Sequence, residues 1–296
     1  FLWQEGHTIH ATAEEAIAET KQMLEIYADV CENVLAMPVL RGVKTDKEKF
    51  AGAEDTYTIE CMMHDHKALQ SGTSHYFGDG FAKAFGIAFS DRENKLRAPF
   101  ETSWGMSTRV IGGLIMTHGD NNGLVLPPRV APTQVIVLPI AAHKPGVTEA
   151  AQAVVERLKA AGIRVKGDFS DNSPGWKFAE WEMKGVPVRL ELGPRDIEAN
   201  ACVAARRDNG EKVTLSLDNL EESVAELLES VQQGLFDKAR RNLEEHTYTA
   251  STVDEVKDVV ENRGGGFVKT MWCGDEACEV RMKEEAGVSS RCIPFE

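Results

Sequence analysis

Three side chains near the start of the sequence combine aromatic, acidic and basic chemistry. Trp3, Glu5 and His7 occupy alternate positions, and alternate residues of a β-strand share one face. A carboxylate flanked by an aromatic ring and an imidazole suits a small cationic amine in a shaped pocket. An amphipathic strand that carries one solvated Glu is the plainer interpretation of the same three residues.

A second polar group lies between residues 64 and 75. We expect Gln70, Thr73 and His75 to lie near one another on a strand or its bulge. A metal site of His64, His66 and His75 is an alternative, because imidazoles two residues apart share a strand face. No nearby carboxylate or Cys completes a tetrahedral site, which disfavours this metalloenzyme hypothesis.

Arg109 follows the segment Ser103–Thr108 and falls in the first turn of an otherwise apolar helix. A surface arginine at the margin of a core helix would explain this pattern. However, the helix is apolar enough to be buried, and a guanidinium there indicates an anionic partner such as phosphate.

These candidate residues need a framework of strands and helices. The capping pattern at Thr12 predicts a helix that ends before Pro38. Between Tyr57 and Pro99 the pattern predicts strands, with a short helix over residues 77–85. Residues 103–118 predict the end of a strand that continues into a helix. We expect the buried face of that helix to carry Val110, Ile111, Leu114 and Ile115.

The stretch 119–128 is rich in turn formers and is predicted to be a linker. After it, strands at 135–139, 163–165, 186–192, 202–205 and 212–217 alternate with helices at 147–161 and 176–184. A long acidic helix follows Asp218. This alternation predicts a mixed sheet with helices packed on it.

Length and charge limit the function classes. The 296 residues suggest two domains or one large domain with an appendage. With 33 basic and 47 acidic residues the formal charge is −14, which argues against a generic nucleic-acid coat protein. Residues 129–212 carry 13 basic and 11 acidic side chains, a net +2, so a polyanion could dock there. No apolar run approaches the ~20 residues of a membrane span, and six sparse cysteines indicate a reducing compartment.

Several ordered stretches resemble the class II prolyl-tRNA synthetases of the archaeal/eukaryotic-like type. They are FLWQEGH, KFAG, QSGTSH, SWGMSTR and HGDNNGLVLPPRVAPTQV. SPGWKFAEWEMKGVPVRLELGPRD resembles the anticodon-binding domain of that family, and WCGDEAC with RCIPFE resembles its zinc-binding C-terminal domain. The resemblance implies an α+β catalytic domain with an antiparallel sheet (1–130), an α/β anticodon-binding domain (131–235) and a small α+β zinc-type domain (236–296).

The resemblance also implies roles for individual residues. The proline pocket would be lined by Trp3, Glu5, His7, Phe50, His75 and Trp104. ATP would contact Gln70, Thr73, Ser107 and Arg109, with Gln70 near Mg²⁺ and Arg109 as the catalytic motif 3 arginine. The anticodon would be read by Glu182, Arg189, Arg195 and Asp196, unless these residues form only surface salt bridges. Cys273 and Cys278 match half of a zinc site, whose second pair would lie beyond Glu296.

The implied activity is the ATP-dependent activation of L-proline and its transfer to tRNA(Pro) by a cytoplasmic homodimeric ligase that needs no membrane and no DNA. Motif 1 and the motif 2 arginine would precede Phe1, so the chain that opens at Phe1 is expected to lack its true beginning and not to activate proline alone. About a hundred residues between Trp3 and Arg109 leave no room for an inserted editing domain. The alternative function is a tRNA anticodon-binding fragment without catalysis.

Overall fold

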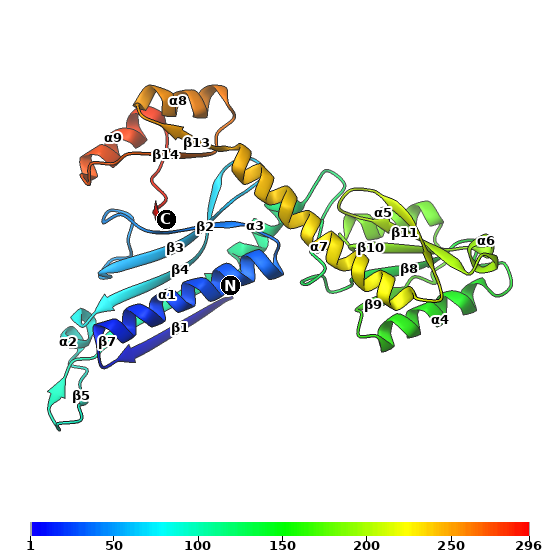
Figure 1. The fold of residues 1–296 in the computed structure, drawn as a ribbon, viewed down its shortest axis with the longest axis horizontal. Coiled ribbons are helices and arrows are strands. Elements are labelled where there is room, and N and C mark those ends of the chain that lie inside the picture. The colour runs from blue at the N-terminus through cyan, green and yellow to red at the C-terminus, as the bar shows by residue number, and fades with distance from the viewer. Residues whose placement is uncertain (1, 296) are drawn as a thin grey trace. The chain divides into compact units, whose positions relative to one another are not determined.

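The computed structural model describes residues 2–295, and their contacts divide the chain into two units. Unit 1 comprises Phe1–Asn33, Met37–Thr117 and Arg240–Glu296, whereas unit 2 comprises Val34–Ala36 and His118–Ala239. The chain passes from unit 2 back to unit 1 within the long helix α7 (Leu220–Glu245) (Figure 1). The C-terminal segment therefore belongs with the first unit and not with the second.

Unit 1 contains a six-stranded sheet in which every neighbouring pair is antiparallel, as the family resemblance implies. In spatial order its strands are β1 (Trp3–His10), β7 (Phe100–Ser107), β4 (Ala68–Gly78), β3 (Asp55–Met62), β2 (Val39–Val43) and β15 (Ile293–Pro294). The last strand comes from the opposite end of the chain, so the sheet is completed by a segment some 250 residues away from its neighbour β2.

Helix α1 (Ala13–Asp29) covers one face of this sheet. It begins at Thr12, whose hydroxyl accepts a hydrogen bond from the Glu15 amide at 3.2 Å. The Tyr27 hydroxyl of α1 donates to the side-chain oxygen of Gln4 on β1. Gln4 and Glu5 are adjacent on β1 and therefore point to opposite faces. The face that carries Glu5 is consequently the one that α1 leaves uncovered.

The other elements of unit 1 are short. They are α2 (Gly80–Phe85), β5 (Phe89–Ser90), β6 (Leu96–Arg97), α3 (Arg109–His118), β13 (Thr247–Ala250), α8 (Val253–Asn262), β14 (Phe267–Thr270) and α9 (Glu276–Ala286). The predicted helix over 77–85 begins only at Gly80, because Phe77 belongs to β4. The predicted buried face of α3 is half wrong: Val110 and Leu114 are buried, but Ile111 is 61% exposed and Ile115 is 40% exposed.

Unit 2 is built on a five-stranded mixed sheet, which confirms the predicted class. Its order is β12 (Lys212–Ser216), β11 (Ala201–Arg206), β10 (Val188–Leu192), β8 (Val135–Pro139) and β9 (Val165–Gly167). β8 pairs in parallel with β9 and β10, whereas the pairings of β11 are antiparallel. The short helix α6 (Pro194–Glu198) follows β10.

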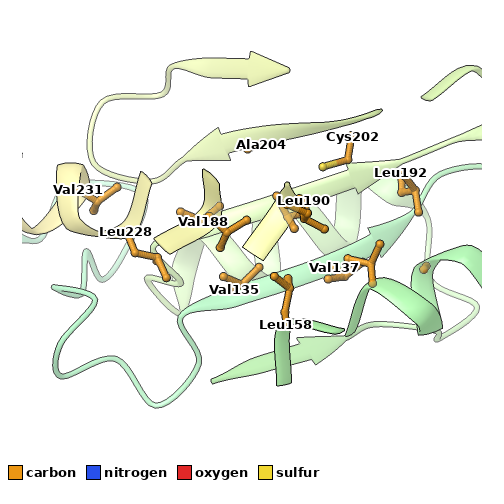
Figure 2. Close-up of a cluster of buried hydrophobic side chains, with 14 of the residues drawn as sticks. Val135, Val137, Leu158, Val188, Leu190, Leu192, Cys202, Ala204, Leu228 and Val231 are labelled. Atoms are coloured by element: carbon orange, nitrogen blue, oxygen red, sulfur yellow. The ribbon is translucent and has the colours of Figure 1, made fainter. Parts of the chain in front are cut away.

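Two layers of helix enclose this sheet. On one face Val137, Val188 and Leu190 pack with Leu158 of α4 (Val147–Ala160) and with Leu228 of α7 (Figure 2). On the other face Ile136 and Leu138 pack against α5 (Pro174–Met183). The alternate side chains of β10 therefore point to opposite faces of the sheet. Its apolar side chains pack in the core with α4 and α7, and its polar side chains lie on the face that α5 covers.

The turn-rich stretch after residue 118 is not a free linker. The amide of Leu124 donates to the Met183 carbonyl at 3.0 Å, and the amide of Leu126 donates to the Gly185 carbonyl at 3.2 Å. These hydrogen bonds attach the stretch to the end of α5, so it forms part of unit 2. Within residues 2–295, no helix is long and apolar enough to cross a membrane.

Candidate functional site

The uncovered face of the unit 1 sheet presents the predicted acidic and aromatic trio. The Trp3 indole nitrogen donates to Glu5 Oε2 at 2.7 Å, and His7 Nε2 lies 3.2 Å from Glu5 Oε1. Both Trp3 and His7 are largely exposed, and the Glu5 side chain is 45% exposed. The carboxylate is therefore bracketed by an indole and an imidazole and open to a small molecule.

A β-bulge brings the second polar group onto the same face. Gly72 lies opposite Ile59 on β3, but Gln70 lies opposite Glu60, so Ser71 is an extra residue on β4. The extra residue restores Gln70 to the face of Thr73 despite the odd spacing. Through β7, Thr73 and Glu5 both lie beside Gly105. The register therefore places the two polar groups on adjoining parts of one surface.

His75 forms the inner edge of this surface. Its Nδ1 lies 3.0 Å from the Thr56 hydroxyl, and its ring centroid lies 5.0 Å from that of Phe50. Burial lowers the pKa of His75 to about 4, although the nearby Glu5 charge opposes the change. The imidazole is consequently neutral near pH 7, and Glu5 is the charged member of the group.

The structure places Trp104 away from the other residues predicted for the proline pocket. Trp104 lies opposite Gly6, which points to the face that α1 covers, and it is only 8% exposed. A Cβ atom on Gly6 would lie 2.3 Å from the indole of Trp104, so the ring lies over this glycine. Trp104 therefore packs beneath the sheet and does not share a face with Glu5, which corrects the expectation.

Arg109 stands at the junction of β7 and α3. The Ser107 hydroxyl accepts from the Arg109 amide at 3.2 Å and so fixes the start of the helix. The Arg109 side chain is exposed, and its guanidinium has no ion-pair partner among residues 2–295. The guanidinium is thus available to an anion, but the exposure of Ile111 shows that its helix is not wholly buried.

The alternative metal sites are incomplete. His66 stacks on His246 with ring centroids 3.7 Å apart, and its Nδ1 lies 3.1 Å from the Gly264 carbonyl. Within residues 2–295, no three His, Cys, Asp or Glu side chains are grouped so that they could hold a metal ion. The Sγ atoms of Cys273 and Cys278 lie 3.0 Å apart, so the pair could supply two of the four ligands that structural zinc requires. The donor set present does not make a zinc site.

Unit 2 carries a second candidate site, a cavity of about 390 Å³ beside β10. Arg189 projects from β10 with its guanidinium 4.1 Å from the Phe178 ring and 2.9 Å from Glu191 Oε1. The Lys212 ammonium also contacts Glu191, at 3.0 Å. Glu182, at the end of α5, accepts from the Asn122 side chain at 3.1 Å. The cavity thus offers positively charged hydrogen-bond donors and negatively charged acceptors.

Only two of the four residues predicted for anticodon contact line this cavity, namely Glu182 and Arg189. Arg195 and Asp196 lie in α6, which follows the other end of β10. Asp196 Oδ2 accepts from the Gly193 amide at 2.8 Å and caps that helix. Asp196 therefore has a local structural role.

Sequence reasoning missed other charged residues of the cavity: Arg206, Arg207, Asp208 and Lys212. The run Arg206-Arg207-Asp208 at the end of β11 could have indicated them. Adjacent arginines at the end of a strand place their positive charges together at one edge of the sheet. The turn residues Asp120 and Asn122 were missed as well, since their stretch was predicted to be a linker.

Family models match three successive segments of the chain. Residues 1–118 match the tRNA synthetase class II core domain (G, H, P, S and T). Residues 134–227 match an anticodon binding domain, and residues 253–296 match the prolyl-tRNA synthetase C-terminal domain. The chain is 62% identical over 295 residues to a proline–tRNA ligase of Lachnospira eligens. It is 61% identical to that of Lachnoclostridium phytofermentans and 59% identical to that of Clostridium novyi.

These matches cover the whole of this chain but only part of each relative. The chain spans 61% of the length of the Lachnospira eligens and Lachnoclostridium phytofermentans proteins and 62% of the Clostridium novyi protein.

Proposed function

We propose that this chain is a member of the class II prolyl-tRNA synthetase family and supplies the amino-acid face and the tRNA-reading unit of a proline–tRNA ligase. Its matches to the class II core and to the prolyl-tRNA synthetase C-terminal domain, and its 62% identity to a proline–tRNA ligase, support this. The ligase activity is proposed for a protein that also carries the segments by which the relatives are longer. The observation that carries the proposal is the Glu5 carboxylate, bracketed by Trp3 and His7 on the open face of the class II sheet.

The chemistry of proline suits this face. Proline is a compact ring with a secondary ammonium, so Glu5 can hold the charge while Trp3 and Phe50 contact the ring. Neutral His75 does not repel the ammonium. Trp104 is left out of the pocket because it packs on the opposite face.

ATP would bind beside the amino acid. Gln70 and Thr73 share the open face. Ser107 ends the neighbouring strand β7, and Arg109 begins α3 directly after it. The exposed Arg109 guanidinium suits a phosphate group. Mg²⁺ bound with ATP would neutralise phosphate charge, with Gln70 as its nearest proposed protein group.

The reaction needs no side-chain nucleophile. The proline carboxylate attacks the α-phosphorus of ATP, which forms prolyl-adenylate and releases pyrophosphate. A terminal ribose hydroxyl of tRNA then attacks the prolyl carbonyl, which forms the ester and releases AMP. The protein contributes position and charge neutralisation, which agrees with the Glu5 carboxylate on the open face and the exposed Arg109 at the start of α3.

The cavity of unit 2 would read the anticodon. Proline anticodons share two guanines, whose Watson–Crick edges offer N1–H and N2–H to a carboxylate, and whose O6 and N7 accept from a guanidinium. Glu182 and Arg189 supply those two groups at one cavity. We propose further that the complete enzyme is a cytoplasmic homodimer that uses proline, ATP and tRNA(Pro).

Direct binding of tRNA to the 296-residue chain tests the reading function. We expect a fluorescently labelled tRNA(Pro) transcript to bind more tightly than one whose two anticodon guanines are replaced by adenines. Each lost base contact should cost about 1–3 kcal/mol. Glu182→Ala should abolish most of this difference, whereas Glu149→Ala, on the exposed side of α4, should not.

Equal affinity for the two transcripts would refute the anticodon role. Proline-dependent pyrophosphate exchange separates the two candidate functions when it is measured on a protein that also carries the segments by which the relatives are longer. Exchange by that protein supports the ligase, whereas selective tRNA binding without exchange favours the alternative, an anticodon-binding chain that does not catalyse.

A further inference from the structure

A tight turn between the two family matches forms one wall of the unit 2 cavity. Asp120 and Gly123 exchange two backbone hydrogen bonds of 3.1 Å each, and both Asp120 and Asn122 line the cavity. Neither residue falls within the stretches matched by the class II core or the anticodon binding domain. The cavity is therefore completed by residues outside both domain patterns.

Gly123 allows this turn to lie against α5. Its φ of +129° is one that glycine adopts readily. A Cβ atom at this position would lie 2.5 Å from the Met183 carbonyl oxygen. A side chain would push the turn away from the end of α5, where Glu182 lies.

Asn122 contacts the Glu182 carboxylate from this turn. Its side-chain amide donates to Glu182 Oε1 at 3.1 Å, and its backbone amide donates to Asp120 Oδ1 at 2.9 Å. Within the part of the chain that the structure describes, no donor contacts Glu182 Oε2. One oxygen of this cavity-lining carboxylate is thus held by a neutral amide, and the other accepts no hydrogen bond from the described residues.

Arg207 fixes the same turn to the main chain of Glu182. It donates to both oxygens of Asp120, at 2.6 and 2.7 Å, and its Nε donates to the Glu182 carbonyl at 3.0 Å. The Arg207 side chain is 6% exposed. The turn is therefore anchored by a bidentate ion pair whose arginine is nearly buried, which limits the movement of the turn and of Asn122.

We propose that Asn122 is a positioning residue, which orients the Glu182 carboxylate to accept hydrogen bonds from a guanine of the anticodon. This inference rests on the proposed anticodon-reading function of the cavity. A neutral amide suits the task, because it fixes one carboxylate oxygen without neutralising the charge that attracts the N–H groups of guanine. The Asp120–Arg207 pair holds the turn from which Asn122 reaches Glu182.

A double-mutant cycle on the 296-residue chain tests this proposal. The variants are Asn122→Ala, Glu182→Ala and the combination, each titrated with the tRNA(Pro) transcript and with the transcript whose anticodon guanines are replaced. Asn122→Ala should weaken binding of the first transcript by about tenfold, the loss typical of one hydrogen bond to a charged group. It should leave the second nearly unchanged. In the Glu182→Ala background it should have no further effect.

Asn122→Asp provides a second variant, since it keeps the shape of Asn122 but sets another carboxylate beside Glu182. It should weaken binding more than Asn122→Ala. The positioning role is overturned if Asn122→Ala binds like the parent, or if it weakens binding by the same factor with and without Glu182. If Glu182→Ala itself binds like the parent, the proposed anticodon function fails instead. An unchanged urea midpoint of Asn122→Ala separates loss of contact from loss of fold.

Discussion

The fully buried carboxylate of Glu60 allows a sharp test of how the C-terminal segment supports the unit 1 sheet. Glu60 Oε1 accepts from the Lys44 ammonium at 2.9 Å and from the Thr58 hydroxyl at 3.0 Å. Oε2 accepts from Arg291 at 3.1 and 3.2 Å. Glu60 is 0% exposed and Lys44 is 8% exposed. One anion is thus shared by two cations, and one of these lies 231 residues away in sequence.

The expected costs follow from burial. Lys44→Met removes a nearly buried partner and should cost about 3–5 kcal/mol of the free energy of unfolding, because it leaves a buried charge poorly compensated. The side chain of Arg291 is 32% exposed, so water can partly replace it. Arg291→Ala should therefore cost less, about 1–3 kcal/mol. The triple variant Lys44→Met, Glu60→Leu, Arg291→Met removes all three charges together and should lie within about 2 kcal/mol of the parent.

Urea unfolding measures these differences, followed by hydrogen exchange of β3 peptides so that the signal reports unit 1. Lys47→Met is the matched control, because no ion pair to Lys47 exists among residues 2–295. A cost of less than about 1 kcal/mol for Lys44→Met would refute the reasoning from burial. A triple variant as unstable as Lys44→Met would refute the claim that the charges offset one another.

Two further predictions concern one residue in each unit. Burial lowers the pKa of His118 to about 4 from 6.5, so its contribution to stability is complete above pH 6.5 and is lost as the pH falls through 4. Between pH 7 and 4.5 unit 2 should lose about 2 kcal/mol through this group, and hydrogen exchange of β8 should show the loss in the parent but not in His118→Gln. In unit 1, Gly6→Ala should cost about 1–3 kcal/mol in urea unfolding, because the new Cβ overlaps the Trp104 indole. Gly105→Ala is its control, with no atom nearer than 3.8 Å, and an equal cost for both would contradict the overlap.

The alternation of side chains along a strand was enough to predict much of the fold and the shared face of three residues in the unit 1 site. Trp3, Glu5 and His7 share a face because they lie on one strand, whatever its partners are. The same rule separates Arg189 from its apolar neighbours Val188 and Leu190 on β10. Such predictions hold because a strand's side-chain period is fixed by backbone geometry.

Pairing between distant segments could not be predicted in this way. The face of Trp104 depends on which residue of β1 lies opposite it, and a shift of one residue would reverse the assignment. The exposure of Ile111 depends likewise on what packs against α3 and not on the periodicity of the helix. The link between Glu60 and Arg291 joins two segments whose local sequences give no sign of each other.

The turn at residues 120–123 shows why composition alone misplaced part of the second site. Asp, Asn and Gly favour turns in a free linker and in a packed loop alike, so their presence predicts a local conformation but no partner. The partner is supplied by Arg207, whose nearly buried guanidinium ties Asp120 to the main chain of Glu182. Once that contact is made, Asn122 reaches the Glu182 carboxylate. Asn122, which the sequence places in an apparent linker, thereby becomes part of a charged cavity. Its proposed effect on recognition acts through the Glu182 carboxylate that it contacts.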